Sequence, residues 1–403
     1  MTPASWDPRA LREAEFSELG ETIYLNSAST GPLPGRSRRA LEIYNQRRGA
    51  PHLLPDEEVF AMLDHSRSLI ARLLNADAGE IALTPNTTFG INIAAMGLPL
   101  ERGDVVVFSE REFPANAYPW LSLAERGIVV ERLPVTASGW PDEDRLVERM
   151  HDPRVRVVAV SLVQFSNGYA VDLARLSAES RATDTWLVVD GIQGVGQMPV
   201  DLKQTPVDVL AAGGQKWLLG PWGTGFAYVR RELLPLLRPP VIDWMAYEGT
   251  DDFTHLTDYQ DTLRDNARRY EMITLPYQDF DALNHSMELV LEHGVPAIGE
   301  HVRTLQEPLI RWARDRGVSI ASPVDQHRSA VICLAPEHAR ASYDALQEAG
   351  IITSFREGAI RFAPHLFNSM EEMERVVEIL DSGLGTRDAR PASRVPRRGP
   401  SAT

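Results

Sequence analysis

Short apolar runs rich in β-branched residues alternate along the chain with longer stretches in which apolar positions recur at helical spacing. Six such runs occupy 80–84, 104–110, 128–135, 155–165, 185–191 and 208–214, and 223–233 adds a further strand. Runs that are apolar throughout indicate strands buried on both faces. Because helical stretches separate them, the pattern predicts an α/β domain with a mostly parallel sheet.

The pattern changes at both ends of this region. The first residues form an entry arm with one short strand, and helical patterning follows at 34–48 and 56–74. A long helical pattern begins at about Asn284 and leads into a small unit of mixed helices and strands, with one strand predicted at 351–355. The last residues are rich in Pro, Gly, Ser and Arg and are expected to be disordered. We therefore predict an N-terminal arm that contributes to the small domain, a large domain, a small C-terminal domain and a disordered tail, at 1–30, 31–283, 284–384 and 385–403.

Composition narrows the class of protein. Of the 403 residues, 43% are hydrophobic and 24% are charged, as in ordinary globular proteins. The sequence contains neither a long uncharged apolar stretch nor an apolar segment typical of a secretory signal, which predicts a cytoplasmic protein without a membrane partner. The single cysteine, Cys333, excludes an internal disulfide and a thiolate metal cluster, and the net charge of −15 argues against nucleic acid as a partner.

Lysine is almost absent from this sequence. It occurs only at Lys203 and Lys216, so 39 of the 41 basic residues are arginine. Codon bias in a GC-rich genome accounts for the arginines. It does not explain why lysine is kept at these positions. A lysine amine, unlike a guanidinium, readily loses its proton and forms an imine, so lysine is expected where arginine cannot replace it.

Lys216 and Asp190 are the first candidates for chemistry. Lys216 lies in a glycine-rich loop after an apolar strand, where a surface lysine would be out of place, and the glycines permit tight turns beside a ligand. Asp190 ends another apolar strand, 26 residues earlier, at the sheet edge where ligands collect in α/β proteins. Its alternative role is a helix cap. A carboxylate there can keep the nitrogen of a pyridine ring protonated. Gln193, three residues further on, is placed to hydrogen-bond a phenol oxygen on the same ring.

Three further motifs are suited to contact other parts of a ligand with such a ring. Asn86, Thr87 and Thr88 follow a strand and open a helix, which suits a phosphate, although such residues are also ordinary caps. Phe113 follows a strand and can lie over a flat ring, or else belong to the core. Arg361 stands in an apolar run and needs an anion, either a substrate carboxylate or a structural salt-bridge partner.

The order of these motifs resembles the class V aminotransferase group of fold-type I pyridoxal 5′-phosphate (PLP) enzymes, which includes cysteine desulfurases, kynureninase and isopenicillin N epimerase-like proteins. The resemblance covers roughly residues 20 to 384. It implies a homodimer with shared active sites, an amino-acid substrate, and a large domain with a mostly parallel seven-stranded sheet beside a small α+β domain.

The resemblance also implies residue roles. Lys216 would carry PLP as an imine, with Asp190 on the pyridine nitrogen and Gln193 near the phenol oxygen. The remaining roles are phosphate binding by the 86–88 segment, chiefly Thr88, ring stacking by Phe113, carboxylate binding by Arg361, and contact with the neighbouring subunit's phosphate by Thr274.

The sequence departs from the desulfurases at three points. Desulfurases carry Ser-Gly-His before the lysine, where this chain has Gly213, Gly214 and Gln215; Gln215 can still donate a hydrogen bond, but the serine contact is lost. Phe113 stands where they stack a histidine. They also present a nucleophilic cysteine on a loop before the Arg361 region, whereas Cys333 lies inside an apolar strand.

The motifs do not reveal which reaction follows at the α-carbon. Some isopenicillin N epimerase-like enzymes cleave C–S bonds in thiol and antibiotic pathways, so the resemblance favours a PLP-dependent lyase that cleaves the C–S bond of an S-substituted cysteine by β-elimination, in secondary metabolism such as antibiotic biosynthesis. A decarboxylation-dependent oxidative deaminase, an aminotransferase and an amino-acid epimerase are the alternatives. A PLP-fold protein that only binds is the remote one, and the joint presence of Lys216, Asp190 and Arg361 argues against it.

Overall fold

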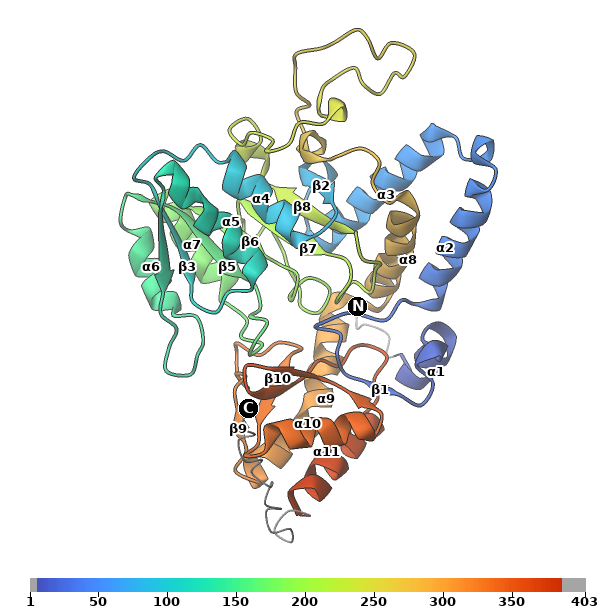
Figure 1. The fold of residues 1–403 in the computed structure, drawn as a ribbon, viewed down its shortest axis with the longest axis vertical. Helices are drawn as coiled ribbons and strands as arrows, with labels where there is room; N and C mark the ends of the chain where they lie inside the picture. The colour runs from blue at the N-terminus through green and yellow to red at the C-terminus, as the bar shows by residue number, and fades with distance from the viewer. Residues whose placement is uncertain (1–5, 386–403) are drawn as a thin grey trace, which may run out of the picture.

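The computed structural model describes residues 6–385, and its centre is a seven-stranded sheet (Figure 1). Only β8 runs antiparallel to its neighbours, so the prediction of a mostly parallel seven-stranded sheet is confirmed. Each strand lies within one of the seven predicted runs. In spatial order they are β2 (Ile81–Thr84), β8 (Gly225–Val229), β7 (Val209–Gly213), β6 (Trp186–Asp190), β5 (Val155–Ser161), β3 (Val105–Ser109) and β4 (Val129–Leu133).

Both faces of this sheet are buried, as its continuous apolar strands require. In β3, Val105 and Val107 belong to one buried cluster, whereas Val106 and Phe108 belong to another. Helix α4 (Thr87–Gly97) packs on the second face with the short α5 (Tyr118–Leu121). The first face is covered by α3 (Asp56–Leu74), α6 (Glu143–Met150) and α7 (Leu173–Thr183).

The long helical pattern predicted from Asn284 is two helices. Helix α8 (Tyr277–His293) begins earlier than predicted and packs along α2 (Gly35–Arg48) and α3. Gly294, at φ 80°, ends it, and α9 (Val295–Asp315) follows with a proline in its first turn. The predicted boundary at 283/284 therefore falls inside α8, and the division into domains stays a prediction.

A second, antiparallel sheet lies below the first in Figure 1, with α10 (Ala339–Glu348) and α11 (Met370–Gly385) beside it. Its strand order is β12 (Ser354–Arg356), β13 (Ala359–Phe362), β10 (Ile332–Ala335) and β9 (Ser319–Ile320). The predicted strand at 351–355 is divided at Thr353 between β11 (Ile351–Ile352) and β12.

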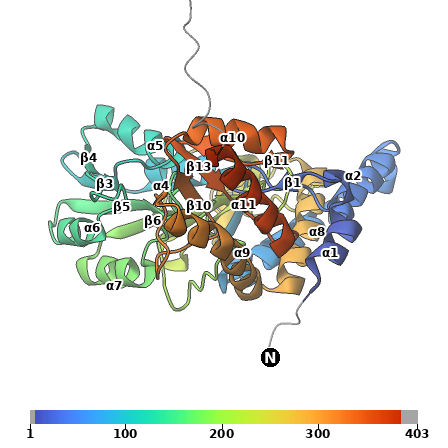
Figure 2. The same cartoon turned by 90° about the horizontal axis from the view of Figure 1, so that it is seen from below.

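The N-terminal arm joins this lower part of the molecule. After α1 (Pro8–Glu15), strand β1 (Ile23–Tyr24) pairs in parallel with β11, and the two lie side by side in Figure 2. The arm then continues through residues 25–31, where Gly31 N donates to the carbonyl oxygen of Gln215 (2.8 Å). The predicted tail lies outside the described residues from 386 onward. Among the described helices, none has the length and apolar character needed to cross a bilayer.

Candidate active site

Asp190 ends β6 in the middle of the large sheet, and its side chain is buried. Its Oδ1 accepts a hydrogen bond from Ile192 N (3.0 Å), whereas Oδ2 has no hydrogen-bond partner among the described residues. Burial raises the pKa of this carboxyl group to about 7. Burial of a carboxylate oxygen without a hydrogen-bond donor costs free energy. The arrangement is therefore suited to a ligand that supplies a donor to Oδ2.

Lys216 follows β7, the strand beside β6, and is also buried. Burial lowers the pKa of its amine to about 8, against the opposing effect of Asp190. A low pKa favours the neutral amine, which is the form that attacks carbonyl carbon. Gly31 of the arm lies so near that a Cβ there would be 2.2 Å from the Lys216 carbonyl oxygen, which explains the glycine.

Phe113 stands near Lys216 at the open side of the site. The Lys216 Nζ lies 5.6 Å from the centre of its ring, and the ring meets Phe165 edge-on at 5.2 Å. Phe113 is 40% exposed, so it does not serve as a core residue in this chain. Its free surface is available to a flat ring.

The start of helix α4 combines three predicted phosphate ligands. Asn86 is the N-cap, and its Oδ1 accepts a hydrogen bond from Phe89 N (2.9 Å). Thr87 is buried with its Oγ1 unpaired among the described residues, and Thr88 is exposed. An unpaired hydroxyl group at the N-terminus of this eleven-residue helix is suited to bind an anion.

Gln193 is held firmly by two neighbours. Its Nε2 donates to Ala28 O (2.9 Å) and its Oε1 accepts from Trp217 Nε1 (2.9 Å), so one N–H remains for a ligand. Gln215, which precedes Lys216, is partly buried.

Arg361 in β13 is 2% exposed and donates only to neutral groups. Its partners are Ser354 Oγ (3.0 Å), Phe165 O (2.8 Å) and Ser29 Oγ (2.8 Å). No carboxylate pairs with it among the described residues, so the structural salt bridge considered above is not formed there. Burial lowers the pKa of its guanidinium to about 10, which leaves a charged group in need of an anion.

The chain also matches a known family. The model of the family "Aminotransferase class-V" matches residues 23–361. This chain belongs to the class V aminotransferase family.

Relatives within the class V family differ in activity. A probable cysteine desulfurase of Methanothermobacter thermautotrophicus is 28% identical over 91% of this chain and 96% of its own length. Isopenicillin N epimerase of Streptomyces clavuligerus is 28% identical over 90% of this chain and 95% of its own length.

Solved structures of the cystine C–S lyase C-DES share the fold. In one, glycine is covalently linked to its PLP cofactor (TM-score 0.83), and in the other, its product cysteine persulfide is bound (TM-score 0.82). Each is 22% identical to this chain, and they cover 93% and 91% of it and 99% of their own chains.

The cofactor of this class V enzyme is PLP, and the residues present fit it. The unpaired Asp190 Oδ2 lacks the donor that a protonated ring nitrogen supplies, and the unpaired Thr87 Oγ1 lies where a phosphate can bind. Lys216 would supply the amine. All the individual roles stay predictions: those of Asn86, Thr87, Thr88, Phe113, Asp190, Gln193, Gln215 and Lys216 toward the cofactor, and that of Arg361 toward the substrate.

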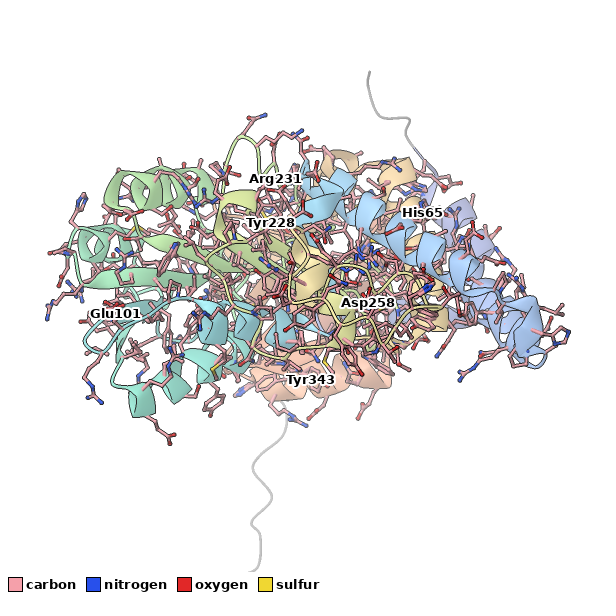
Figure 3. All side chains as sticks on the ribbon, turned by 90° about the horizontal axis from the view of Figure 1, so that it is seen from above. His65, Glu101, Tyr228, Arg231, Asp258 and Tyr343 are labelled. Carbon is pink, nitrogen blue, oxygen red and sulfur yellow. The ribbon has the colours of Figure 1, made fainter. Side chains whose placement is uncertain are left out.

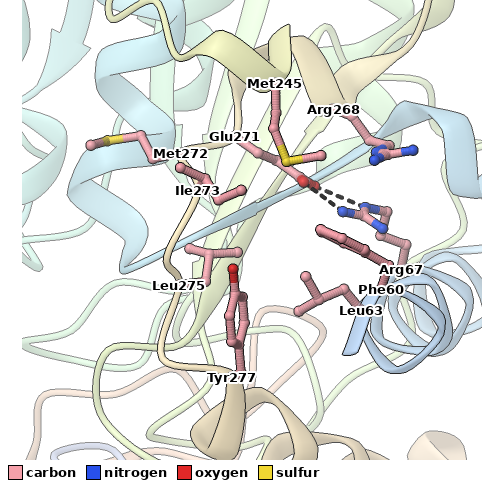
Figure 4. Close-up of a pocket in the computed structure, with 10 residues that line it drawn as sticks. All are labelled: Phe60, Leu63, Arg67, Met245, Arg268, Glu271, Met272, Ile273, Leu275 and Tyr277. Atoms are coloured by element: carbon pink, nitrogen blue, oxygen red, sulfur yellow. Dashed lines mark hydrogen bonds and ion pairs between the residues drawn. The ribbon is translucent and has the colours of Figure 1, made fainter. Parts of the chain in front are cut away.

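Thr274 is placed apart from these residues. It is exposed, has φ 62°, and no described contact joins it to Lys216, Asp190 or Arg361. It lies in the segment that lines the pocket of Figure 4, which Glu271 fixes through its ion pair with Arg67. Its predicted contact with the phosphate of a neighbouring subunit stays a prediction.

Sequence reasoning missed Glu112, a buried acid next to Phe113. Its carboxylate accepts hydrogen bonds from Ser161 N (2.9 Å), from the Ser161 hydroxyl, and from Gln164 Nε2 (2.7 Å) and Asn116 Nδ2 (3.1 Å). Burial raises the pKa of Glu112, and its charge in turn raises the pKa of Asp190. Glu112 thus ties the Phe113 segment to the end of β5. The only sequence signal is an acid three residues after the end of the buried strand β3.

Proposed function

We propose that this class V enzyme is a PLP-dependent C–S lyase acting on an S-substituted cysteine. In the overall reaction the Cα–H and Cβ–S bonds break, and water completes the conversion to pyruvate, ammonia and a free thiol. The observation that carries the proposal is the position of Cys333, the only thiol in the chain.

Cys333 is unsuited to accept sulfur from a substrate. It lies in β10 opposite Arg361, is fully buried, and its Sγ donates to Ser166 O (3.2 Å). Burial raises the pKa of this thiol to about 11, so little thiolate forms at neutral pH. Without a nucleophilic thiol, sulfur leaves as a free thiol rather than as a protein persulfide.

The site residues supply the remaining steps. PLP, when bound, draws electrons away from the bonds of an attached amino acid's α-carbon. Arg361 holds the α-carboxylate with its planar fork and so orients the Cα–H bond. The Lys216 amine takes the proton from Cα, and Asp190 holds the proton at the ring nitrogen.

An epimerase is the second candidate, because isopenicillin N epimerase is similar over nearly the whole chain. Removal of the α-proton is common to both reactions. Epimerisation returns the proton to Cα, whereas elimination breaks the Cβ–S bond.

Product analysis with a panel of S-substituted L-cysteines separates the candidates, with Lys216→Ala as the inactive control. Equimolar thiol, pyruvate and ammonia support the lyase. Appearance of the D-isomer identifies an epimerase, an oxo acid that retains its sulfur substituent identifies a transaminase, and release of carbon dioxide identifies a decarboxylating deaminase. Each of these last three results overturns the proposal.

We also propose that the chain forms a homodimer. The segment before α8 exposes several large apolar side chains, including Trp244, Phe253, Leu256 and Tyr259, the last at 86% exposure. Figure 3 shows Asp258 on this segment at the surface. A surface of this kind is typical of an interface. Sedimentation of the holoenzyme tests this, and a monomer at micromolar concentration would contradict it.

A further inference from the structure

A second arginine, Arg356, lies on the same side of the small sheet as Arg361. Ser354 is opposite Arg361 in the register of β12 and β13, and the two side chains are hydrogen-bonded. Side chains two residues apart on a strand point to the same face. Arg356 is two residues beyond Ser354, so its side chain leaves the sheet on the face that carries Arg361.

The opposite face confirms this assignment. Ile360 and Phe362 of β13 belong to the buried cluster of the small sheet, and Phe355 of β12 packs against that cluster. Arg356 and Arg361 alternate with these residues and face the large sheet instead. Arg356 lies close enough to Lys216 and Arg361 to lower the pKa of both.

Arg356 has no anionic partner among the described residues. Its guanidinium donates to the carbonyl oxygen of the preceding residue, Phe355 O (2.9 Å), and its side chain is exposed. Glu357 follows it at the turn, with φ 47°, but no ion pair joins the two. One face of this sheet therefore carries two arginines for which the described residues offer no acidic partner.

A buried polar atom between these groups and the large sheet also lacks a partner. Ser166 Oγ is unpaired among the described residues, and Ser166 follows Phe165, whose carbonyl oxygen binds Arg361. The site thus offers Arg361 for one anion and, about 6.6 Å of strand further toward the open end, Arg356 for another.

We infer that Arg356 recognises a second acidic group on the substrate, a carboxylate at the far end of its side chain. The substrate class is then an S-substituted cysteine with an anionic substituent. This inference rests on the proposed function for the identity of the bond that breaks, but not for the binding of the distal acid.

Binding to the holoenzyme tests the inference without any C–S bond. The absorbance change on titration gives Kd for L-glutamate and for L-glutamine, which differ at the distal group alone. We expect glutamate to bind about tenfold more tightly, and Arg356→Gln to remove this preference while leaving glutamine binding within about twofold. Arg375→Gln on the exposed surface of α11 is the matched control and is expected to change neither value.

Charge reversal and turnover complete the experiment. Arg356→Glu is expected to reverse the preference. With S-carboxymethyl-L-cysteine and its neutral analogue S-carbamoylmethyl-L-cysteine, the wild type is expected to favour the acid in kcat/KM. Equal Kd values for glutamate and glutamine in the wild type, or a preference that survives in both Arg356 variants, overturn the inference. Failure to release thiol from either cysteine, with the binding preference intact, overturns the proposed function alone.

Discussion

Arg67 and Arg361 are both buried, at 5% and 2% exposure, but their partners differ. Arg67 forms two hydrogen bonds with Glu271 (2.8 and 2.5 Å) and one with Asp64 (2.6 Å), beside the pocket of Figure 4. Arg361 meets only two hydroxyl groups and a carbonyl oxygen. The carboxylates of Glu271 and Asp64 raise the pKa of Arg67 despite its burial. The pKa of Arg361, which has no such partners, is lowered by burial.

The comparison separates groups that stabilise the fold from groups that are available to ligands. Where two opposite charges are buried as a pair, removal of one leaves the other uncompensated and destabilises the protein. Where it has none, the missing partner is expected to come from the cofactor or substrate. Asp190, with its unpaired Oδ2, resembles Arg361 in this respect.

The largest effect is expected for Lys216→Ala. Without this amine PLP cannot be held covalently, so the absorbance band at about 420 nm disappears and turnover is abolished. Lys203→Ala, at the exposed second lysine, should keep both. Loss of the band in the Lys203 variant, or its retention in the Lys216 variant, would remove Lys216 from this role.

Arg361→Ala and Arg67→Ala are expected to have opposite consequences. Loss of Arg361 should cost about 2–5 kcal/mol in transition-state binding, since it removes one partner of a charge pair with the substrate. It should reduce the free energy of unfolding by less than the loss of Arg67 does, because it leaves no opposite charge buried and unpaired. Loss of Arg67 should instead reduce the free energy of unfolding by about 3–5 kcal/mol, because Glu271 is left buried and unpaired.

Urea unfolding of the apoenzymes and kcat/KM of the holoenzymes measure the two effects. The comparison fails if Arg361→Ala destabilises the fold as much as Arg67→Ala does. Arg361→Lys is expected to restore little activity, since a point charge does not reproduce a planar fork.

Asp190→Asn is expected to keep PLP bound but to lose about a hundredfold in kcat, because an amide cannot hold a proton at the ring nitrogen. The apoenzyme should respond to pH as well. A carboxyl pKa raised on folding, from 3.8 to about 7, means that the folded state binds the proton more tightly, so wild-type stability falls as pH rises through this interval. Asp190→Asn should lack that loss when thermal unfolding is followed between these pH values. Near-normal kcat would remove Asp190 from the role.

Cys333→Ala is expected to show the smallest change, with kcat and PLP content within about twofold of wild type, because the thiol acts as a small apolar residue. Steady-state kinetics and the rate of thiol labelling in the folded protein check this. An inactive but folded Cys333→Ala enzyme with full PLP content would revive the desulfurase mechanism.

The sequence predicted the large sheet strand by strand, because strands buried on both faces form continuous apolar runs. It placed the start of α8 too late and missed the break at Gly294, since the apolar spacing continues across both positions. The short strands β1 and β11 lie within predicted strands, but their parallel pairing was not predicted, because it joins segments far apart in the sequence.

For the candidate site, the sequence could indicate residues but not their contacts. Lys216 and Asp190 stand out by residue type at strand ends, where ligands bind. The partners of Arg361 come from segments near residues 29, 165 and 354, so only the fold could show that all of them are neutral. The same limit hid Glu112, which accepts two of its four hydrogen bonds from Ser161 at the end of β5 and a third from Gln164 beyond it.

The role of Arg361 is tested most directly by kcat/KM for an S-substituted cysteine and for the matching amine without its α-carboxylate, in the wild type and in Arg361→Ala. If Arg361 binds the α-carboxylate, the substitution lowers kcat/KM for the amino acid by a factor that corresponds to about 2–5 kcal/mol of transition-state binding. The value of kcat/KM for the amine stays almost unchanged. Equal losses on both compounds, or a wild type that prefers the amine, would contradict the account.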